Sequence, residues 1–378
     1  MKYATIALII ACSLVASDLD ALVADDSLRA KLERNLENTG ENRSALEQAI
    51  ARTDGQVREG LVFLLANSSE VNLVDLDPDS IIEEVRLAHL ARDKYPWGKE
   101  ITDEQFLHYV LPNQVSQEQH TFYRAYFLEQ FDSLLDTIQT GSEAAIAINY
   151  WCGQRVRFQQ TQRQDQGVFH TLSSGYGRCE EMMIVYVSAL RAAGIPAREA
   201  WTPYWAHCDN NHAWTELWAD GSWHFAGSCE PQPSLDNAWF NKSARRAAVT
   251  MSSAFGVPET DEILYRDRDS YSIINSTPYY IDNPAKLVVE TNAESTDVFL
   301  AVFNFGALRP IMRQNTGDST DVTFIIGHGS FQVYAGNDSS FASAIVETEF
   351  GETTELTLIP EKGAALGENK FWLRLPAE

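Results

Sequence analysis

Residues 173–231 constrain the fold most, because they join a helix that begins at a cysteine to a strand that begins at a histidine. The Gly- and Ser-rich stretch before Cys179 disfavours a helix, whereas the apolar residues after it recur at helical spacing. Gly194 and Pro196 then end the helix. We therefore predict Cys179 in a first helical turn, where unpaired N–H groups and the helix dipole favour a thiolate.

Residues 212–226 predict a β-hairpin. Large and small side chains alternate after His212, Asp220-Gly221 is a strong signal for a two-residue turn, and residues 223–226 form the returning strand. A cysteine at a helix start that faces a histidine on a strand is the minimum for a thiol nucleophile activated by imidazole. A third group should then orient the imidazole.

These motifs resemble the transglutaminase-like superfamily, and in particular its bacterial exported members. The resemblance covers residues 151–240 and rests on Gly-Arg-Cys-Glu, on Leu-Arg-Ala-Ala-Gly-Ile-Pro-Ala-Arg, on Asn-His-Ala-Trp-Thr-Glu and on Asp-Gly-Ser-Trp. It implies a papain-like core with Cys179 as the nucleophile and His212 as the base.

The family usually completes its triad with an Asp before a Pro on the strand that follows the histidine strand. Gly227 stands at that place here, and the nearest acidic residue before a proline is Glu230. A small bulge at Gly227 would bring Glu230 into register. We therefore predict Glu230 as the third member, with Asp209 and Asp236 as alternatives.

Three further residues are predicted to contact the substrate. Trp201 and Trp205 lie close in sequence to His212 and would form an aromatic wall, with core packing as the alternative. Asn211 directly precedes His212 and is expected to face the cleft. No calcium loop or close zinc-ligand spacing is recognisable, so we predict no metal and no other cofactor.

The chain contains five cysteines, namely Cys12, Cys152, Cys179, Cys208 and Cys229. The catalytic interpretation keeps Cys179 free. Cys208 precedes the histidine strand and Cys229 follows its hairpin partner, so a disulfide between them and two unpaired thiols are equal alternatives. A metal site made of Cys208, His212 and Cys229 would lack the close ligand pair of a zinc site.

The N-terminus predicts export. Lys2 precedes a short apolar run and small residues, which is typical of a signal peptide over residues 1–17. Ile9-Ile10-Ala11-Cys12 resembles a lipobox, so a lipid anchor at Cys12 is the alternative to simple secretion. In both cases we expect a periplasmic or extracellular protein without a later transmembrane span. A net charge of −24 argues against binding to nucleic acid.

We predict an α+β protein with four parts after the signal peptide. Residues 18–140 have helical periodicity, residues 141–255 contain the transglutaminase-like core, and residues 256–284 are turn-rich and read as a linker. Residues 285–378 contain short alternating segments between turns, which indicate an antiparallel β-sandwich of immunoglobulin-like kind.

The function predicted from these features is that of an exported thiol enzyme. Cys179 would attack an amide of a protein or peptide to form a thioester, while His212 transfers the proton. The acyl group then passes to water, as in a peptidase or amidase, or to an amine, as in a crosslinking transglutaminase. We favour hydrolysis by analogy with the family's hydrolases. A non-catalytic binding or scaffold protein is the other alternative, because the expected Asp is missing.

Overall fold

The computed structural model describes residues 19–162, 164–205, 207–259, 262–267, 270–336 and 340–362. The predicted signal peptide and Cys12 lie outside these residues. The chain divides into two compact units between Glu83 and Glu84, a point inside helix α6 (Pro78–Lys94). None of the helices in the described ranges combines the length and the apolar character needed to cross a bilayer.

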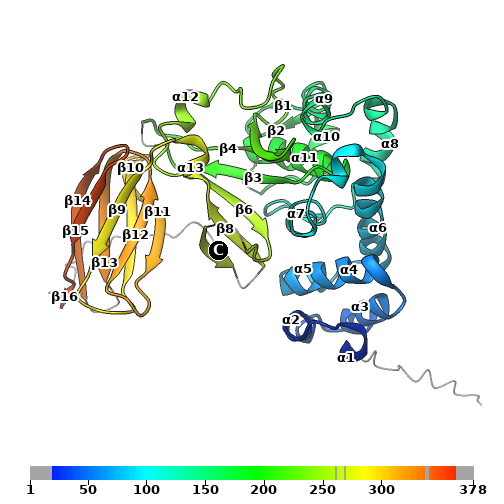
Figure 1. Ribbon diagram of the computed structural model, residues 1–378, viewed down its shortest axis with the longest axis horizontal. Helices are drawn as coiled ribbons and strands as arrows, with labels where there is room; N and C mark the ends of the chain where they lie inside the picture. Colours follow the sequence, from blue (N-terminus) through cyan, green and yellow to red (C-terminus); the bar gives the residue numbers. More distant parts are fainter. Residues whose placement is uncertain are drawn as a thin grey trace, which may run out of the picture. The chain divides into compact units, whose positions relative to one another are not determined.

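The first unit is helical, as the sequence predicts (Figure 1). Its helices before α6 are α1 (Leu19–Leu22), α2 (Asp26–Glu37), α3 (Asn42–Ala51), α4 (Gly55–Asn67) and α5 (Glu70–Leu73). Helix α2 shows why they form: the Asp25 side chain accepts the Leu28 N–H at 2.8 Å, and Leu32 and Leu36, one turn apart, are both buried.

Helices α8 (Arg124–Leu135), α9 (Gly141–Gly153) and α10 (Val168–Ser174) pack against α11 (Cys179–Ala192), the helix that begins at Cys179 (Figure 1). The second unit also contains η1 (Pro96–Lys99), α7 (Asp103–Tyr109) and, after the hairpin, α12 (Asn241–Ala244). Helix α11 is buried along nearly its whole length, and α8 and α9 share its apolar cluster. Helix α8, predicted in the N-terminal helical region, thus belongs to the core by its packing.

A six-stranded antiparallel sheet lies at the centre of this unit, within the described residues, in the order β5-β4-β3-β6-β8-β7. The strands are β3 (Ala197–Thr202), β4 (His212–Ala219), β5 (Ser222–Ala226), β6 (Met251–Phe255), β7 (Ile263–Asp267) and β8 (Tyr271–Asn275). A parallel pair, β1 (Arg157–Phe158) and β2 (Tyr176–Gly177), leads to α11. Asp220 and Gly221 both have positive φ, as the predicted β4–β5 turn requires.

The stretch predicted as a linker, residues 256–284, is instead part of the core. It supplies β7 and β8 to the central sheet and continues into α13 (Thr277–Tyr280). The reason is long-range pairing: β8 pairs with β6, and the buried Tyr280 donates its hydroxyl to Glu216 on β4 at 2.8 Å. Turn-rich sequence around these short strands hides such pairing from local analysis.

The C-terminal β region, residues 285–362, contains two further sheets (Figure 1). Its strands are β9 (Ala285–Glu290), β10 (Asp297–Asn304), β11 (Ala307–Asn315), β12 (Asp321–Ile326), β13 (Gly329–Gly336), β14 (Ser340–Thr348), β15 (Thr353–Thr357) and β16 (Glu361–Lys362). Alternate residues of these strands form one apolar cluster. The pairing is antiparallel except for β15 with β9, which is parallel.

The C-terminal β region contacts the loop that leads to His212. Asn304, the last residue of β10, donates its side-chain N–H groups to the carbonyls of Trp205 (2.7 Å) and Cys208 (2.8 Å). The Phe305 N–H donates to the Asp209 carboxylate at 2.8 Å. The β10–β11 hairpin therefore fixes the chain just before the predicted base.

Candidate active site

Cys179 is the first residue of α11, as predicted, and Glu181 fixes this helix start. The buried Glu181 carboxylate accepts the Arg178 backbone N–H at 2.7 Å and the Thr161 hydroxyl at 2.8 and 2.7 Å. It also accepts the Gln166 N–H at 3.3 Å. Glu181 thus ties the preceding loop to the first turn and holds the Cys179 backbone in place.

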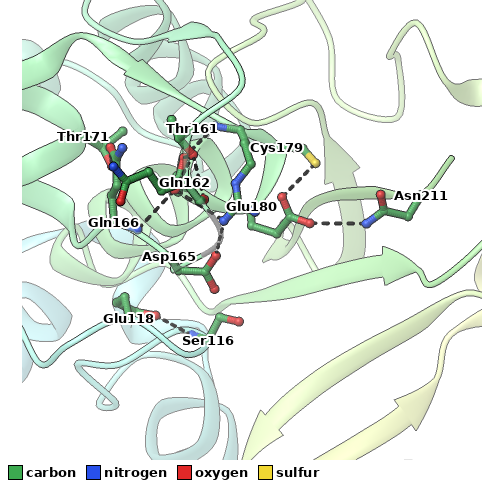
Figure 2. Close-up of polar contacts among 12 residues, drawn as sticks. Ser116, Glu118, Thr161, Gln162, Asp165, Gln166, Thr171, Cys179, Glu180 and Asn211 are labelled. Carbon is green, nitrogen blue, oxygen red and sulfur yellow. Dashed lines mark hydrogen bonds and ion pairs between the residues drawn. The ribbon is translucent and has the colours of Figure 1, made fainter. Parts of the chain in front are cut away.

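The Cys179 thiol donates a hydrogen bond to Glu180 (Sγ–Oε2, 3.1 Å; Figure 2). The other Glu180 oxygen, Oε1, accepts the side-chain N–H of Asn211 at 3.3 Å. Burial, and then the charge and hydrogen bond of Glu180, raise the pKa of the Cys179 thiol to about 12, although the N–H groups of Ala213 and Glu180 oppose this. The thiol is therefore neutral at rest, despite its place at a helix N-terminus.

His212 is the first residue of β4 and is 9 % exposed. Its ring centroid lies 4.8 Å from that of Trp239, 4.8 Å from that of Phe240 and 5.8 Å from that of Trp214. Burial lowers the pKa of the imidazole to about 4, against the charge of Glu180. The imidazole is therefore neutral at physiological pH and can accept a proton.

The thiol and the histidine strand are neighbours, because the backbone N–H of Ala213, the residue after His212, faces the Cys179 sulfur. In this structure the thiol donates to Glu180 rather than to the imidazole. The imidazole Nε2 is buried and has no hydrogen-bond partner among the described residues. The Nε2 atom of His212 is therefore available to accept or donate a hydrogen bond.

Glu230 lies beside Gly227, the place where the family has its Asp: a Cβ added at Gly227 would be 3.0 Å from Glu230 Oε2. That oxygen accepts the Trp239 indole N–H at 2.8 Å. Since Trp239 packs on the His212 ring, Glu230 reaches the imidazole through the indole rather than by a direct hydrogen bond.

The two alternative third residues are engaged elsewhere. Asp236 accepts from the His224 ring at 2.7 Å and from the Phe225 N–H at 2.9 Å. Asp209 accepts the Phe305 N–H. Neither carboxylate hydrogen-bonds to His212 within the ranges that the structure describes.

Residues 131–226 match the sequence model of the transglutaminase-like superfamily. The chain contains a transglutaminase-like core. The matched residues include Cys179 and His212 but end before Glu230. The predicted fold class is therefore confirmed for the core.

Solved structures that are similar to part of the chain include two proteins. A candidate cysteine protease from Cytophaga hutchinsonii is 20 % identical, with a TM-score of 0.25, over 41 % of this chain and 57 % of its own. A candidate protease from Parabacteroides distasonis is 14 % identical, with a TM-score of 0.28, over 57 % of this chain and 36 % of its own. Each match spans less than two thirds of the relative. A search of curated protein sequences gave no match.

The predicted substrate-binding residues occupy three different environments in and around the transglutaminase-like core. Asn211 is exposed and contacts Glu180 beside the thiol. Trp205 is 3 % exposed and stacks parallel to Trp214 at 6.4 Å, so its ring has no free face for a substrate and serves core packing. Trp201 is partly buried against the apolar cluster of the C-terminal β region.

The cysteines around the transglutaminase-like core are unpaired in the described residues, so the Cys208–Cys229 disulfide is not formed. Cys208 is exposed, whereas Cys229 is buried and hydrogen-bonds with Cys152 at the end of α9. The two segments touch closely: a Cβ added at Gly153 would lie 2.8 Å from the Cys229 carbonyl oxygen. Among the described residues, no group of three or more His, Cys, Asp or Glu side chains is placed to hold a metal.

Glu199 on β3 is an acidic residue of the transglutaminase-like core that the sequence does not single out. Its carboxyl group hydrogen-bonds with Ser116 and Ser253, and burial raises its pKa to about 8. No local signal marks it, because it occupies an ordinary place in an alternating strand. Its pairing with two distant serines depends on the folded structure.

We expect Glu199→Gln to stabilise the protein at alkaline pH. A glutamate of ordinary pKa near 4.5 loses its proton more readily in the unfolded chain than Glu199 does in the fold, so stability falls as pH rises from about 4.5 to about 8. Glutamine keeps both serine contacts and cannot ionise. We expect thermal unfolding to give a melting temperature about 5 °C higher at pH 8.5 and unchanged at pH 4. Glu129→Gln, an exposed site on α8, is the control, and an equal gain at both pH values would contradict the argument.

Proposed function

We propose that this protein is an exported thiol enzyme that hydrolyses amide bonds of proteins or peptides through a thioester on Cys179. The observation that carries the proposal is the position of the Cys179 sulfur at the start of α11, against the N–H of the residue that follows His212. Export rests on the sequence of residues 1–17 alone.

The proposed reaction has two stages. The Cys179 sulfur attacks the amide carbon while His212 accepts the thiol proton, and collapse of the tetrahedral intermediate breaks the C–N bond. The imidazolium returns the proton to the leaving amine, and a thioester remains. Water, deprotonated by His212, then releases the carboxylic acid and restores the thiol. Because the pKa of the resting thiol is high and that of the imidazole is low, proton transfer accompanies attack instead of preceding it.

Glu230 is proposed as a positioning residue that acts through Trp239. Its carboxylate holds the indole N–H, and the indole ring supports one side of the imidazole. If this is so, Glu230→Ala and Trp239→Phe should each slow acylation, and the double variant should be no slower than either, because both remove the same contact. Additive losses would instead mean that the two residues act separately.

A non-catalytic binding protein is the second candidate, and one observation favours it. The thiol and imidazole do not share a hydrogen bond, and Nε2 is unpartnered among the described residues. Catalytic contacts often tighten only when substrate binds, so this resting geometry is also compatible with an enzyme.

The test is acetyl transfer from p-nitrophenyl acetate, an activated acyl donor. We expect a hydroxylamine-sensitive acetyl group on the Cys179 peptide, found by mass spectrometry, in the wild type and in Cys208→Ala, and none on this peptide in Cys179→Ala. Decay of the thioester in buffer alone would support hydrolysis, and an amide product formed with added primary amine would support acyl transfer. A Cys179 that is acetylated no faster than the exposed Cys208 would favour the binding protein.

A further inference from the structure

The Glu180 carboxylate lies at the nucleophile without a cationic partner. Its oxygens contact the Cys179 thiol and the Asn211 amide, and no Lys or Arg among the described residues forms an ion pair with it. The neighbouring Arg178 is already paired with Asp165 at 2.7 Å and with Glu181 at 3.4 Å. Burial, and to a lesser extent the charges of Glu180 and Glu181, raise the pKa of Asp165, against the charge of Arg178. The charged groups around the thiol among these residues are therefore mostly acidic: Glu180, Glu181 and Asp165 against Arg178.

The helix dipole alone does not account for this arrangement. A carboxylate in a first turn is stabilised wherever it points, and Glu181 already closes the helix start. Glu180 instead extends across from α11 to the loop before β4, with one oxygen on the sulfur and the other on Asn211 (Figure 2). Because one Glu180 oxygen lies 3.1 Å from the sulfur, a substrate group next to the carbonyl that Cys179 attacks would come close to this carboxylate.

The aromatic surface at the imidazole has matching chemistry. Trp239 packs on the His212 ring but is 65 % exposed, and Glu230 engages its indole N–H. Exposed indole faces attract alkylammonium and guanidinium groups. The site thus offers a carboxylate at the sulfur and an open aromatic face at the imidazole.

We propose that Glu180 is a specificity-determining residue that selects substrates carrying an alkylammonium or guanidinium group next to the scissile amide. This inference rests on the proposed function. The cation pairs with the Glu180 carboxylate and replaces the thiol as the hydrogen-bond donor to that carboxylate. The released thiol is then free to donate to His212, and the nearby positive charge stabilises the negative charge that the sulfur gains as its proton moves to the imidazole during attack. A cationic substrate would in this way help to activate its own nucleophile.

Charge-matched alkylating agents test the inference without a known substrate. The rate of Cys179 labelling is measured by peptide mass spectrometry with neutral iodoacetamide, anionic iodoacetate and cationic (2-bromoethyl)trimethylammonium. Each rate is divided by that of N-acetylcysteine amide with the same reagent. We expect the normalised labelling rate of the wild type with the cationic reagent to be about ten times that with the anionic reagent, because opposite charges in contact near a protein surface attract at least this strongly. This cation-to-anion rate ratio should fall with added salt.

The variants separate charge from shape. We expect Glu180→Gln to bring the ratio within about twofold of one, Glu180→Asp to retain a ratio clearly above one, and the remote Glu129→Gln to match the wild type. A wild-type ratio that persists in Glu180→Gln, or that does not respond to salt, would overturn the inference. If Glu180→Gln does not fold, Glu180→Asp and the salt dependence of the wild type decide.

The outcome is distinguishable from failure of the proposed function. If Cys179 is acetylated but its alkylation shows no charge preference, the proposed thioester chemistry stands and the specificity role of Glu180 is rejected. Charge preference without acetyl transfer would support a cation-binding site around Glu180 and reject the proposed thioester chemistry, and with it the substrate role.

Discussion

Replacing His212 with alanine is expected to slow acetylation of Cys179 by p-nitrophenyl acetate by about 10²- to 10⁴-fold. The effect should be large because the resting thiol has a pKa of about 12 and needs a base at neutral pH. The imidazole, with its pKa lowered to about 4, is unprotonated there and can serve as that base. Single-turnover acetylation, followed at the Cys179 peptide, measures the loss.

The pH profile and chemical rescue show whether His212 acts as a base. A base must be unprotonated, so the wild-type rate should decline only as pH falls through about 4, rather than through the 6.5 of an ordinary histidine. Added imidazole should restore part of the rate in His212→Ala, because the aromatic surroundings leave a ring-sized space. His224→Ala changes the other histidine of the hairpin, which bonds Asp236 instead, and should stay close to the wild type. A His212→Ala rate within threefold of the wild type would reject the base role.

Replacing Glu216 with alanine is expected to lower the free energy of unfolding of the second unit by about 3–5 kcal/mol. Glu216 and Arg198 are 2 % and 0 % exposed and form an ion pair at 2.7 Å between neighbouring strands. Tyr280 donates to the other Glu216 oxygen. Removal of the carboxylate takes the Glu216 charge away from the buried Arg198 guanidinium and the acceptor away from the Tyr280 hydroxyl. Removing one partner of a buried ion pair is strongly destabilising.

Urea denaturation followed by tryptophan fluorescence measures this loss. The matched control is Asp132→Ala, which breaks an ion pair of similar length with Lys94 (2.8 Å). Both partners of that pair are exposed to solvent, so its loss should cost far less than the loss of Glu216. A double variant, Arg198→Met with Glu216→Leu, should recover much of the loss by removing both charges together. If Glu216→Ala and Asp132→Ala lower the free energy of unfolding equally, burial does not make the Arg198–Glu216 pair more important for stability than an exposed pair.

Local sequence signals account for the parts of the site that could be predicted. Cys179 follows a glycine-rich turn and precedes a helical repeat, and His212 opens an alternating strand, so each residue's element follows from neighbours in the sequence. The contacts among Glu180, Asn211 and the thiol join residues about thirty positions apart. From the sequence alone, Glu180 is simply a carboxylate in the first turn of a helix, and only the folded structure shows its contact with Asn211.

The same limit explains the differences in the fold. Strands β7 and β8 lie among turn residues, and only their pairing with each other and with β6 makes them part of the sheet. Helix α8 has an ordinary amphipathic pattern, which predicts a helix but not its partner; Phe127 and Phe131 meet Trp151 of α9 in the core. Strand β11 is hard to recognise from its sequence, because Arg309, Pro310 and Arg313 interrupt its alternation of apolar and polar residues.

The contact between Asn304 and the loop before His212 has a consequence for how such proteins can diverge. The amide of Asn304 supplies hydrogen bonds to two backbone carbonyls, those of Trp205 and Cys208, almost a hundred positions earlier. A recombination event that exchanged the C-terminal β region for one without a matching amide would remove a hydrogen-bond donor from both carbonyls, and the Cys208 carbonyl would keep only the Asn210 N–H of its own loop. A chimaera that replaces the C-terminal β region therefore has to retain a side-chain amide at the position of Asn304 to keep this support for the loop before His212.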